Sequence, residues 1–69
     1  MTNVEMLKNK IASQGYKLSY VAEQLNLSRA GLYKKLNNKT QFNQFEIETL
    51  CDLLSIDDLK EKEAIFFAK

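Results

Sequence analysis

Hydrogen-bond donors and positive charges are concentrated between residues 28 and 40 of this chain. Arg29, Tyr33 and Lys34 recur with the spacing of one helix face, and the methyl group of Ala30 falls beside them. Arginine can bond guanine bidentately, a methyl group can contact thymine, and tyrosine and lysine suit base edges or phosphates. We therefore expect Arg29, Ala30, Tyr33 and Lys34 to contact bases in the major groove of DNA.

A second set of polar side chains has the chemistry for phosphate contacts. A short donor-rich loop follows residue 36, and Lys17 precedes a helix whose first amides could bind an anion. Ser28 can donate its hydroxyl, although capping its own helix is the main alternative. The expected contacts to the DNA backbone are Lys17, Ser28, Asn37, Asn38, Lys39 and Thr40.

Several of these residues also fit roles that need no nucleic acid. Arg29 could be a solvated charge, but a cation in the first turn opposes the helix dipole, and that cost favours a functional reason. Tyr33 could cover an edge of the core. Gly31 costs about 1 kcal/mol relative to alanine within a helix. It would allow close approach of either DNA or the preceding helix.

Charge is distributed unevenly along the chain. Residues 1–41 carry seven basic and two acidic side chains, a net charge of +5, whereas residues 42–69 carry three basic and seven acidic ones, a net charge of −4. Small domains can show such an imbalance by chance. Here four of the basic residues lie within or just after residues 18–37, so one end of the molecule is expected to approach a polyanion.

The composition argues against an enzyme. The chain has no histidine and a single cysteine, Cys51, which we expect to be a small buried thiol on a helix. It has no glycine-rich phosphate loop and no cysteine–histidine cluster, so neither a cofactor nor a metal is expected. Residues 1–69 are long enough for one domain. No transmembrane run or signal peptide is visible, and a cytoplasmic location is expected.

Hydrophobic spacing predicts an all-α chain of five helices. The central pair spans residues 18–37, where Ala22 is small enough for a close helix crossing and Asn26 tolerates the positive φ of a tight turn. Such a pair is a helix-turn-helix. The expected helix starts are Thr2 with Glu5 as a capping box, Lys17 to Ser19 with Ser19 as the better cap, Ser28, Asn43 with Glu46 as a capping box, and Asp57 or Asp58. The expected ends are about Gln14 before Gly15, Leu25 and about Asn37.

Three consecutive apolar residues, Ile65, Phe66 and Phe67, come near the end of the chain. At about 100° per residue they cover more of a helix surface than so small a core can bury. Either two pack inside and one is exposed, or the surplus meets a second copy of the chain. We favour the second interpretation and expect Ile65, Phe66 and Phe67 to form a dimer interface.

Residues 4–59 resemble the Cro and phage-repressor class of helix-turn-helix proteins, the XRE family. The strongest part of the resemblance is the unit in which Val21, Ala22, Leu25, Leu27, Ser28 and Leu32 occupy the expected positions, followed by a polar loop and a fourth amphipathic helix. The resemblance implies a compact five-helix lambda-repressor-like domain that binds operator DNA as a homodimer. It also implies a bacterial or phage-encoded transcription regulator, with the base-reading positions at Arg29, Ala30, Tyr33 and Lys34.

The chain departs from that pattern at three positions. Asn26 replaces the usual glycine of the turn, Leu18 replaces a glutamine that often starts the second helix, and Lys35 falls where a hydrophobic residue is usual. The alternative function is a protein-interaction module, similar to an anti-repressor or an antitoxin. Such a module would use the acidic, phenylalanine-tipped C-terminal half to bind another protein.

Overall fold

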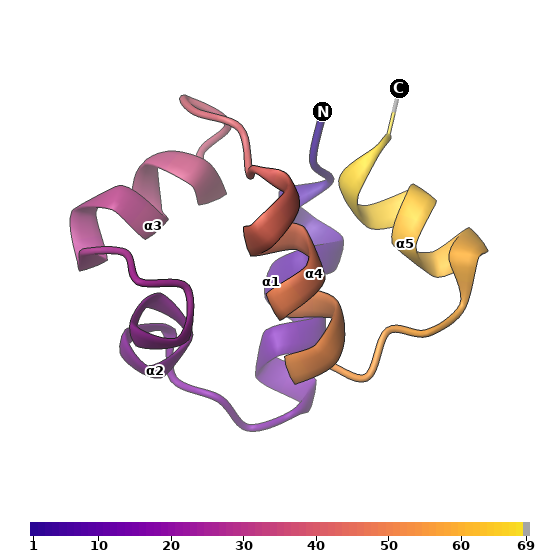
Figure 1. The fold of residues 1–69 in the computed structure, drawn as a ribbon, viewed down its shortest axis with the longest axis horizontal. Helices are drawn as coiled ribbons and strands as arrows, with labels where there is room; N and C mark the ends of the chain where they lie inside the picture. The colour runs from indigo at the N-terminus through magenta and orange to yellow at the C-terminus, as the bar shows by residue number, and fades with distance from the viewer. Residues whose placement is uncertain (69) are drawn as a thin grey trace.

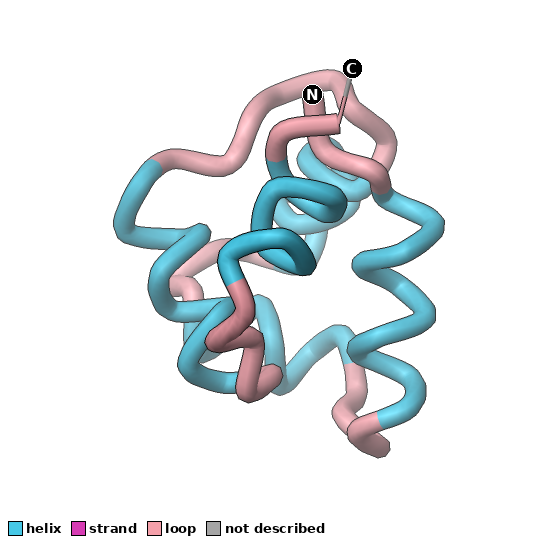
Figure 2. Tube along the Cα trace, turned by 90° about the vertical axis from the view of Figure 1, so that its right-hand side faces the viewer, coloured by secondary structure: helices cyan, strands magenta, loops and turns pink. Residues whose placement is uncertain are grey.

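A computed structural model describes residues 1–68, and Lys69, which was counted in the charge above, lies outside the described residues. Every regular element in residues 1–68 is an α-helix, which confirms the predicted all-α class (Figure 1). In Figure 2 the helices are joined by short loops and surround a common centre. The helices are α1 (Val4–Ser13), α2 (Leu18–Gln24), α3 (Arg29–Leu36), α4 (Gln44–Leu53) and α5 (Leu59–Phe66).

Side-chain caps begin three helices where the sequence predicts them. The Ser28 hydroxyl oxygen accepts a hydrogen bond from the amide of Gly31 at the start of α3. At the start of α4, Asn43 and Glu46 form the predicted capping box. Asp58 caps α5 by accepting from the amide of Lys60 at 2.9 Å. Local hydrogen-bond chemistry therefore sets these starts, as expected for helix N-termini.

One predicted start is wrong, and a second start lies in the predicted range but lacks the expected cap. Thr2 is buried and does not cap α1; instead the side chain of Asn3 accepts from the amide of Met6 at 3.2 Å. Packing places Thr2 in the interior because the amide of Asn3 donates to Ile65 O of α5 at 2.6 Å. Helix α2 begins at Leu18, within the predicted range of Lys17 to Ser19, but no side chain caps it and Ser19 lies inside the helix.

Four helices end in the same way. After α1, α2, α3 and α4 the chain takes a positive φ, at Gly15 (78°) and at Asn26, Asn38 and Ser55 (57° each). In each case the next amide donates to a carbonyl five residues earlier, as Leu27 N does to Ala22 O at 2.9 Å. This is the Schellman motif, which satisfies carbonyls that the helix leaves free. The positive φ expected at Asn26 is confirmed.

The core lies between all five helices and consists of aliphatic residues with two phenylalanines. Phe42, from the loop before α4, meets Phe66 of α5 edge to face with ring centroids 6.2 Å apart. Tyr16 and Tyr20 stack with centroids 5.3 Å apart, and the Tyr16 hydroxyl donates to Leu53 O at 3.4 Å. The fully buried side chains are Leu7, Val21, Leu25, Leu32, Leu36, Leu50, Leu54 and Ile65.

The two ends of the described chain lie together beside α5 (Figure 1). The amino group of Met1 donates to Ala68 O at 3.3 Å, in addition to the bond between Asn3 and Ile65. Helices α1 and α5 pack against each other, and Lys10 and Glu61 form an ion pair between them at 3.3 Å. None of the helices in residues 1–68 has the length and apolar character needed to cross a bilayer.

Candidate functional site

Helix α3 has one buried face and one solvent-exposed face. Leu32 and Leu36 are buried, whereas the predicted base-contacting residues are all exposed. At about 100° per residue, positions 29, 30, 33, 34 and 37 fall within one continuous arc of about 140° that lies beside the two leucines. Arg29, Ala30, Tyr33 and Lys34 of the helix, with the C-cap residue Asn37, are therefore presented on a single surface. We call this surface the α3 face.

The charges on the α3 face are free of partners within the described residues. Neither Arg29 nor Lys34 forms an ion pair in residues 1–68, and the exposed fraction of Tyr33 is 44%. No acidic residue occurs in α3. The exposed acids of the C-terminal half instead lie on α4, on α5 and between them, at Glu48, Asp52, Asp57, Asp58 and Glu63. The face therefore offers unneutralised positive charge.

Helix α2 packs against α3. Ala22 is buried in the core, and Leu27 packs partly on the core after the turn at Asn26. A β-carbon at Gly31 would lie 3.2 Å from Ser28 Oγ and 3.9 Å from the Leu27 side chain. The residue therefore leaves room for the cap at Ser28, and α2 is not among the nearest neighbours of this position.

The predicted phosphate-binding residues flank the α3 face on two sides. Asn37, Lys39 and Thr40 are exposed in the connection from α3 to α4, and Lys17 is exposed where α2 begins. Figure 1 shows these two connections at opposite sides of the α2–α3 pair. Ser28 is exposed as well, and its oxygen caps α3. Asn38 is half-buried, and its Oδ1 is buried without a hydrogen-bond partner.

Lys35 points away from the α3 face, and the sequence did not predict its contact. Its ammonium group lies 3.0 Å from Glu46 Oε1, and the two side chains are only 14% and 5% exposed. Sequence analysis assigned Glu46 to the capping box but missed this ion pair. The available signal was the position of Lys35 itself, on the side of α3 away from the α3 face and about 60° from the buried Leu32.

The cysteine thiol of the chain is half-buried on α4. Desolvation by burial raises the pKa of Cys51, and the nearby carboxylates of Asp52, Glu48 and Glu61 act in the same direction against the opposing charge of Lys62. A raised pKa keeps the thiol protonated near neutral pH, and the thiolate is the reactive form. Cys51 is partly buried and packs against the core.

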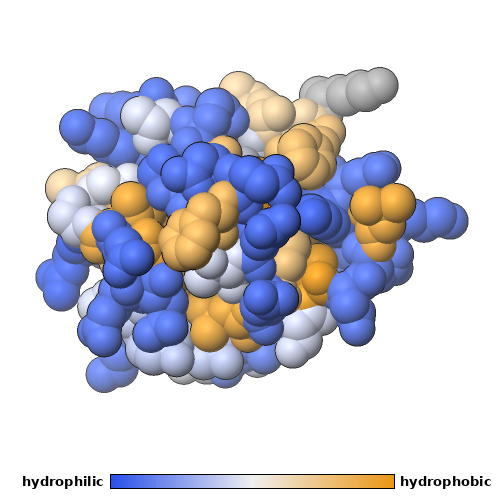
Figure 3. Space-filling view, in the orientation of Figure 1, coloured by the Kyte–Doolittle hydropathy of each residue, from blue (hydrophilic) through white to orange (hydrophobic). Residues whose placement is uncertain are grey.

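The expected dimer interface requires correction. Ile65 and Phe66 are 1% and 3% exposed, because both pack into the core of their own chain. They are not available to a partner. Phe67 is 52% exposed, and Met1 and Met6 are exposed large apolar side chains. In Figure 3 hydrophobic residues form separate spots among hydrophilic ones, some of them beside the chain ends at the top of the view.

Compared with known protein families, with curated proteins and with solved structures, the chain gives no significant match.

Proposed function

We propose that this protein is a sequence-specific DNA-binding transcriptional regulator in which α2 and α3 form a helix-turn-helix. The α3 face would enter the major groove, where Arg29 and Ala30 would reach base edges first and Tyr33 and Lys34 would follow one turn later. The observation that carries the proposal is the α3 face itself. It combines exposed donors, unpaired positive charge and a methyl group on one helix surface that the core leaves free.

The residues that flank this face complete the proposed site. Lys17 on one side, with Asn37, Lys39 and Thr40 on the other, would bind phosphates and fix the position of α3 in the groove. Ser28 can donate its hydroxyl proton to a phosphate while its oxygen still caps α3. The half-buried Asn38 would contribute to phosphate binding through its position in the loop. Such a regulator would act in the cytoplasm at a bacterial or phage operator, as the resemblance to Cro-type repressors implies.

A second copy of the chain would bind at the α5 side of the molecule. Phe67 is exposed there, and Met6 lines a shallow groove of about 330 Å³ between α1 and α5. In Figure 1 this side lies away from α3, so a two-fold pair joined there keeps both α3 faces free. The operator would then be an inverted repeat with half-sites about 34 Å apart.

Selection of bound duplexes from a random pool tests this proposal. We expect a recovered inverted repeat whose affinity falls steeply with salt, with a slope of about −0.9 per phosphate neutralised. Recovery of unrelated sequences with equal, weak affinity would overturn sequence-specific regulation.

A protein-interaction module is the second candidate. Phe45, Leu59 and Phe67 are 56%, 67% and 52% exposed on the acidic half of the chain, which is the observation that favours it. Such a module would bind duplexes weakly, without regard to sequence, and Arg29→Ala would leave that binding unchanged. The duplex selection therefore separates the two functions.

A further inference from the structure

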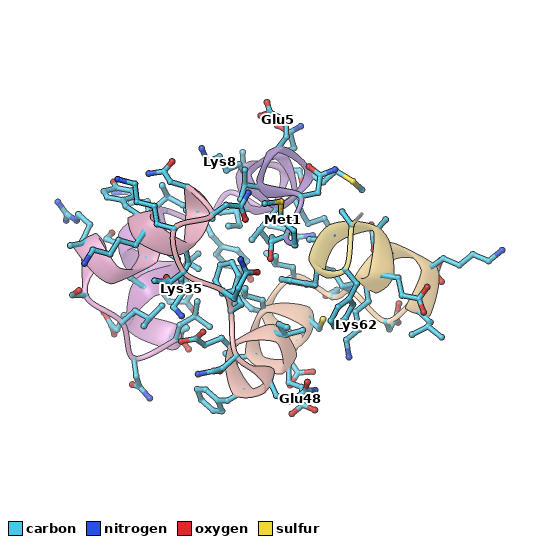
Figure 4. The ribbon with its side chains drawn as sticks, turned by 90° about the horizontal axis from the view of Figure 1, so that it is seen from above. Met1, Glu5, Lys8, Lys35, Glu48 and Lys62 are labelled. Atoms are coloured by element: carbon cyan, nitrogen blue, oxygen red, sulfur yellow. The ribbon has the colours of Figure 1, made fainter. Side chains whose placement is uncertain are left out.

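The side chain of Lys35 joins three parts of the chain. Its Nζ donates to Gln41 O at 2.8 Å and forms the ion pair with Glu46 Oε1 at 3.0 Å. It also lies 5.8 Å from the centre of the Phe42 ring. Figure 4 shows Lys35 extending from α3 toward the start of α4, and its side chain is 14% exposed. A lysine of α3 therefore holds both the loop before α4 and the first turn of α4.

The oxygen that Lys35 contacts also organises the start of α4. Glu46 Oε1 accepts a hydrogen bond from the amide of Asn43 at 2.9 Å, and Asn43 Oδ1 accepts from the amide of Glu46 at 2.8 Å. At the other end of the loop, the amide of Lys39 donates to Lys34 O at 2.9 Å. Residues 37–43 are thus fixed at both ends and tied at Gln41 in the middle.

We infer that Lys35 is a positioning residue for phosphate binding: its contacts with Glu46 and Gln41 hold residues 37–43 so that Asn37, Lys39 and Thr40 face a phosphate beside α3. This inference rests on the proposed function. A largely buried ion pair adds little stability compared with apolar residues of similar size. A loop that is already ordered, however, avoids the entropic cost of ordering when a ligand binds.

Salt dependence separates this role from a direct phosphate contact. Each lysine that neutralises a phosphate contributes about 0.9 to the slope of log affinity against log salt. Lys39, which is exposed, is expected to contribute such a term. Lys35 is already neutralised by Glu46, so its removal is expected to lower affinity and to leave the slope unchanged.

The variants Lys35→Met and Glu46→Gln test the inference. Methionine keeps an apolar side chain of similar length, and glutamine can still accept in the capping box. Each single variant leaves one largely buried charge unpaired, so its fold is checked by circular dichroism at the assay temperature, and the double variant removes both charges. Lys60→Met is the matched control, because it removes the same charge from an exposed position on α5. The probes are a labelled duplex of the selected sequence, titrated over a salt series, and amide hydrogen exchange without DNA.

We expect Lys35→Met and Glu46→Gln each to lower the affinity for the duplex about tenfold, the equivalent of one charge-assisted hydrogen bond. The double variant should lose no more than either single variant, because the two side chains act as a unit. The amide of Asn43 should exchange faster in both variants, while amides of α1 are unchanged. Lys60→Met should match the unaltered protein in affinity and in exchange.

Three results would overturn the inference. A fall of about 0.9 in the salt slope of Lys35→Met, the value for the loss of one phosphate contact, would make Lys35 a phosphate contact. Unchanged affinity in Lys35→Met and Glu46→Gln would show that the loop needs no support. If the unaltered protein binds no duplex, the proposed function is refuted. Faster exchange at Asn43 in the variants would then show that the ion pair has only a structural role.

Discussion

A methyl group at position 31 would lie 3.2 Å from Ser28 Oγ, the atom that accepts the hydrogen bond capping α3. Gly31 thus protects the geometry of the helix start, at a cost in helix propensity of about 1 kcal/mol. The cap in turn fixes where the α3 face begins, so Arg29 stands in the first turn with its side chain exposed. At the scale of single residues, the proposed site depends on small residues such as Gly31 as much as on its charged residues.

Arg29 and Lys39 should behave differently when each is changed to alanine. Arg29→Ala should relax specificity at one base pair of each half-site, because a bidentate contact to guanine contributes about 1–3 kcal/mol of discrimination. Lys39→Ala should weaken all duplexes alike and reduce the salt slope by about 1. Affinities for a set of single-base operator variants at two salt concentrations measure both effects. An equal loss on every sequence for both variants would contradict the assigned roles.

Ser55 occupies a left-handed conformation that suits glycine better. A side chain in this region costs about 1–2 kcal/mol, partly offset by the greater entropy of glycine in the unfolded chain. Ser55→Gly should therefore raise the free energy of unfolding by up to about 1 kcal/mol. Gly15→Ala is the converse control, since a β-carbon there meets no atom within 4 Å and any loss is purely conformational. Urea denaturation measures both, and a destabilised Ser55→Gly would contradict the argument.

At the scale of helices, the first turn of α4 combines a cap with an ion pair. Asn43→Ala removes the Oδ1 acceptor, but the amide of residue 43 can still donate to Glu46. We expect a loss of about 1 kcal/mol in the free energy of unfolding, the usual cost of losing a cap. Asn9→Ala, in the middle of α1, is the control and should be neutral or slightly stabilising. Equal losses in thermal unfolding of the two variants would show that the cap contributes nothing.

Helix starts and ends were predictable where short-range chemistry decides them. Ser28, Asn43 and Gly15 each act on an amide or a conformation within a few residues, so spacing alone identified their roles. The same chemistry predicts caps at Thr2 and Ser19, and neither residue caps a helix. For Thr2 the reason is a contact with a distant segment, because the bond between the Asn3 amide and Ile65 O fixes where the backbone turns. Helix α2 begins one residue before Ser19, without a side-chain cap.

In the candidate site, too, features set by a single helix were predictable and features that depend on two helices were not. The exposure of Arg29, Ala30, Tyr33 and Lys34 followed from helix periodicity, which places them in an arc outside that of Leu32 and Leu36. The ion pair of Lys35 with Glu46 and the burial of Ile65 and Phe66 did not follow, because each depends on how two separate helices approach. Periodicity gives the direction of a side chain from its own helix axis but does not identify what it meets.

At the scale of the whole molecule, the proposed dimer depends on Phe67, because Ile65 and Phe66 belong to the core. Phe67→Glu should place a charge on the proposed interface and convert a dimer to a monomer in sedimentation, with the melting temperature little changed. Operator affinity should fall because the dimer is lost, while binding to a single half-site is retained. Leu59→Glu, at another exposed apolar position of α5, is the control. A dimer that persists in Phe67→Glu would exclude this surface.

The arrangement of the tyrosines also gives the protein an intrinsic optical signal. The chain has three tyrosines and no tryptophan. Tyr16 and Tyr20 stack on each other, whereas Tyr33 belongs to no aromatic pair among the described residues and lies on the α3 face. Because there is no tryptophan, ultraviolet emission comes from tyrosine, and Tyr33 is the tyrosine on the α3 face. Occupation of that helix by a ligand would then change the fluorescence of an unlabelled sample.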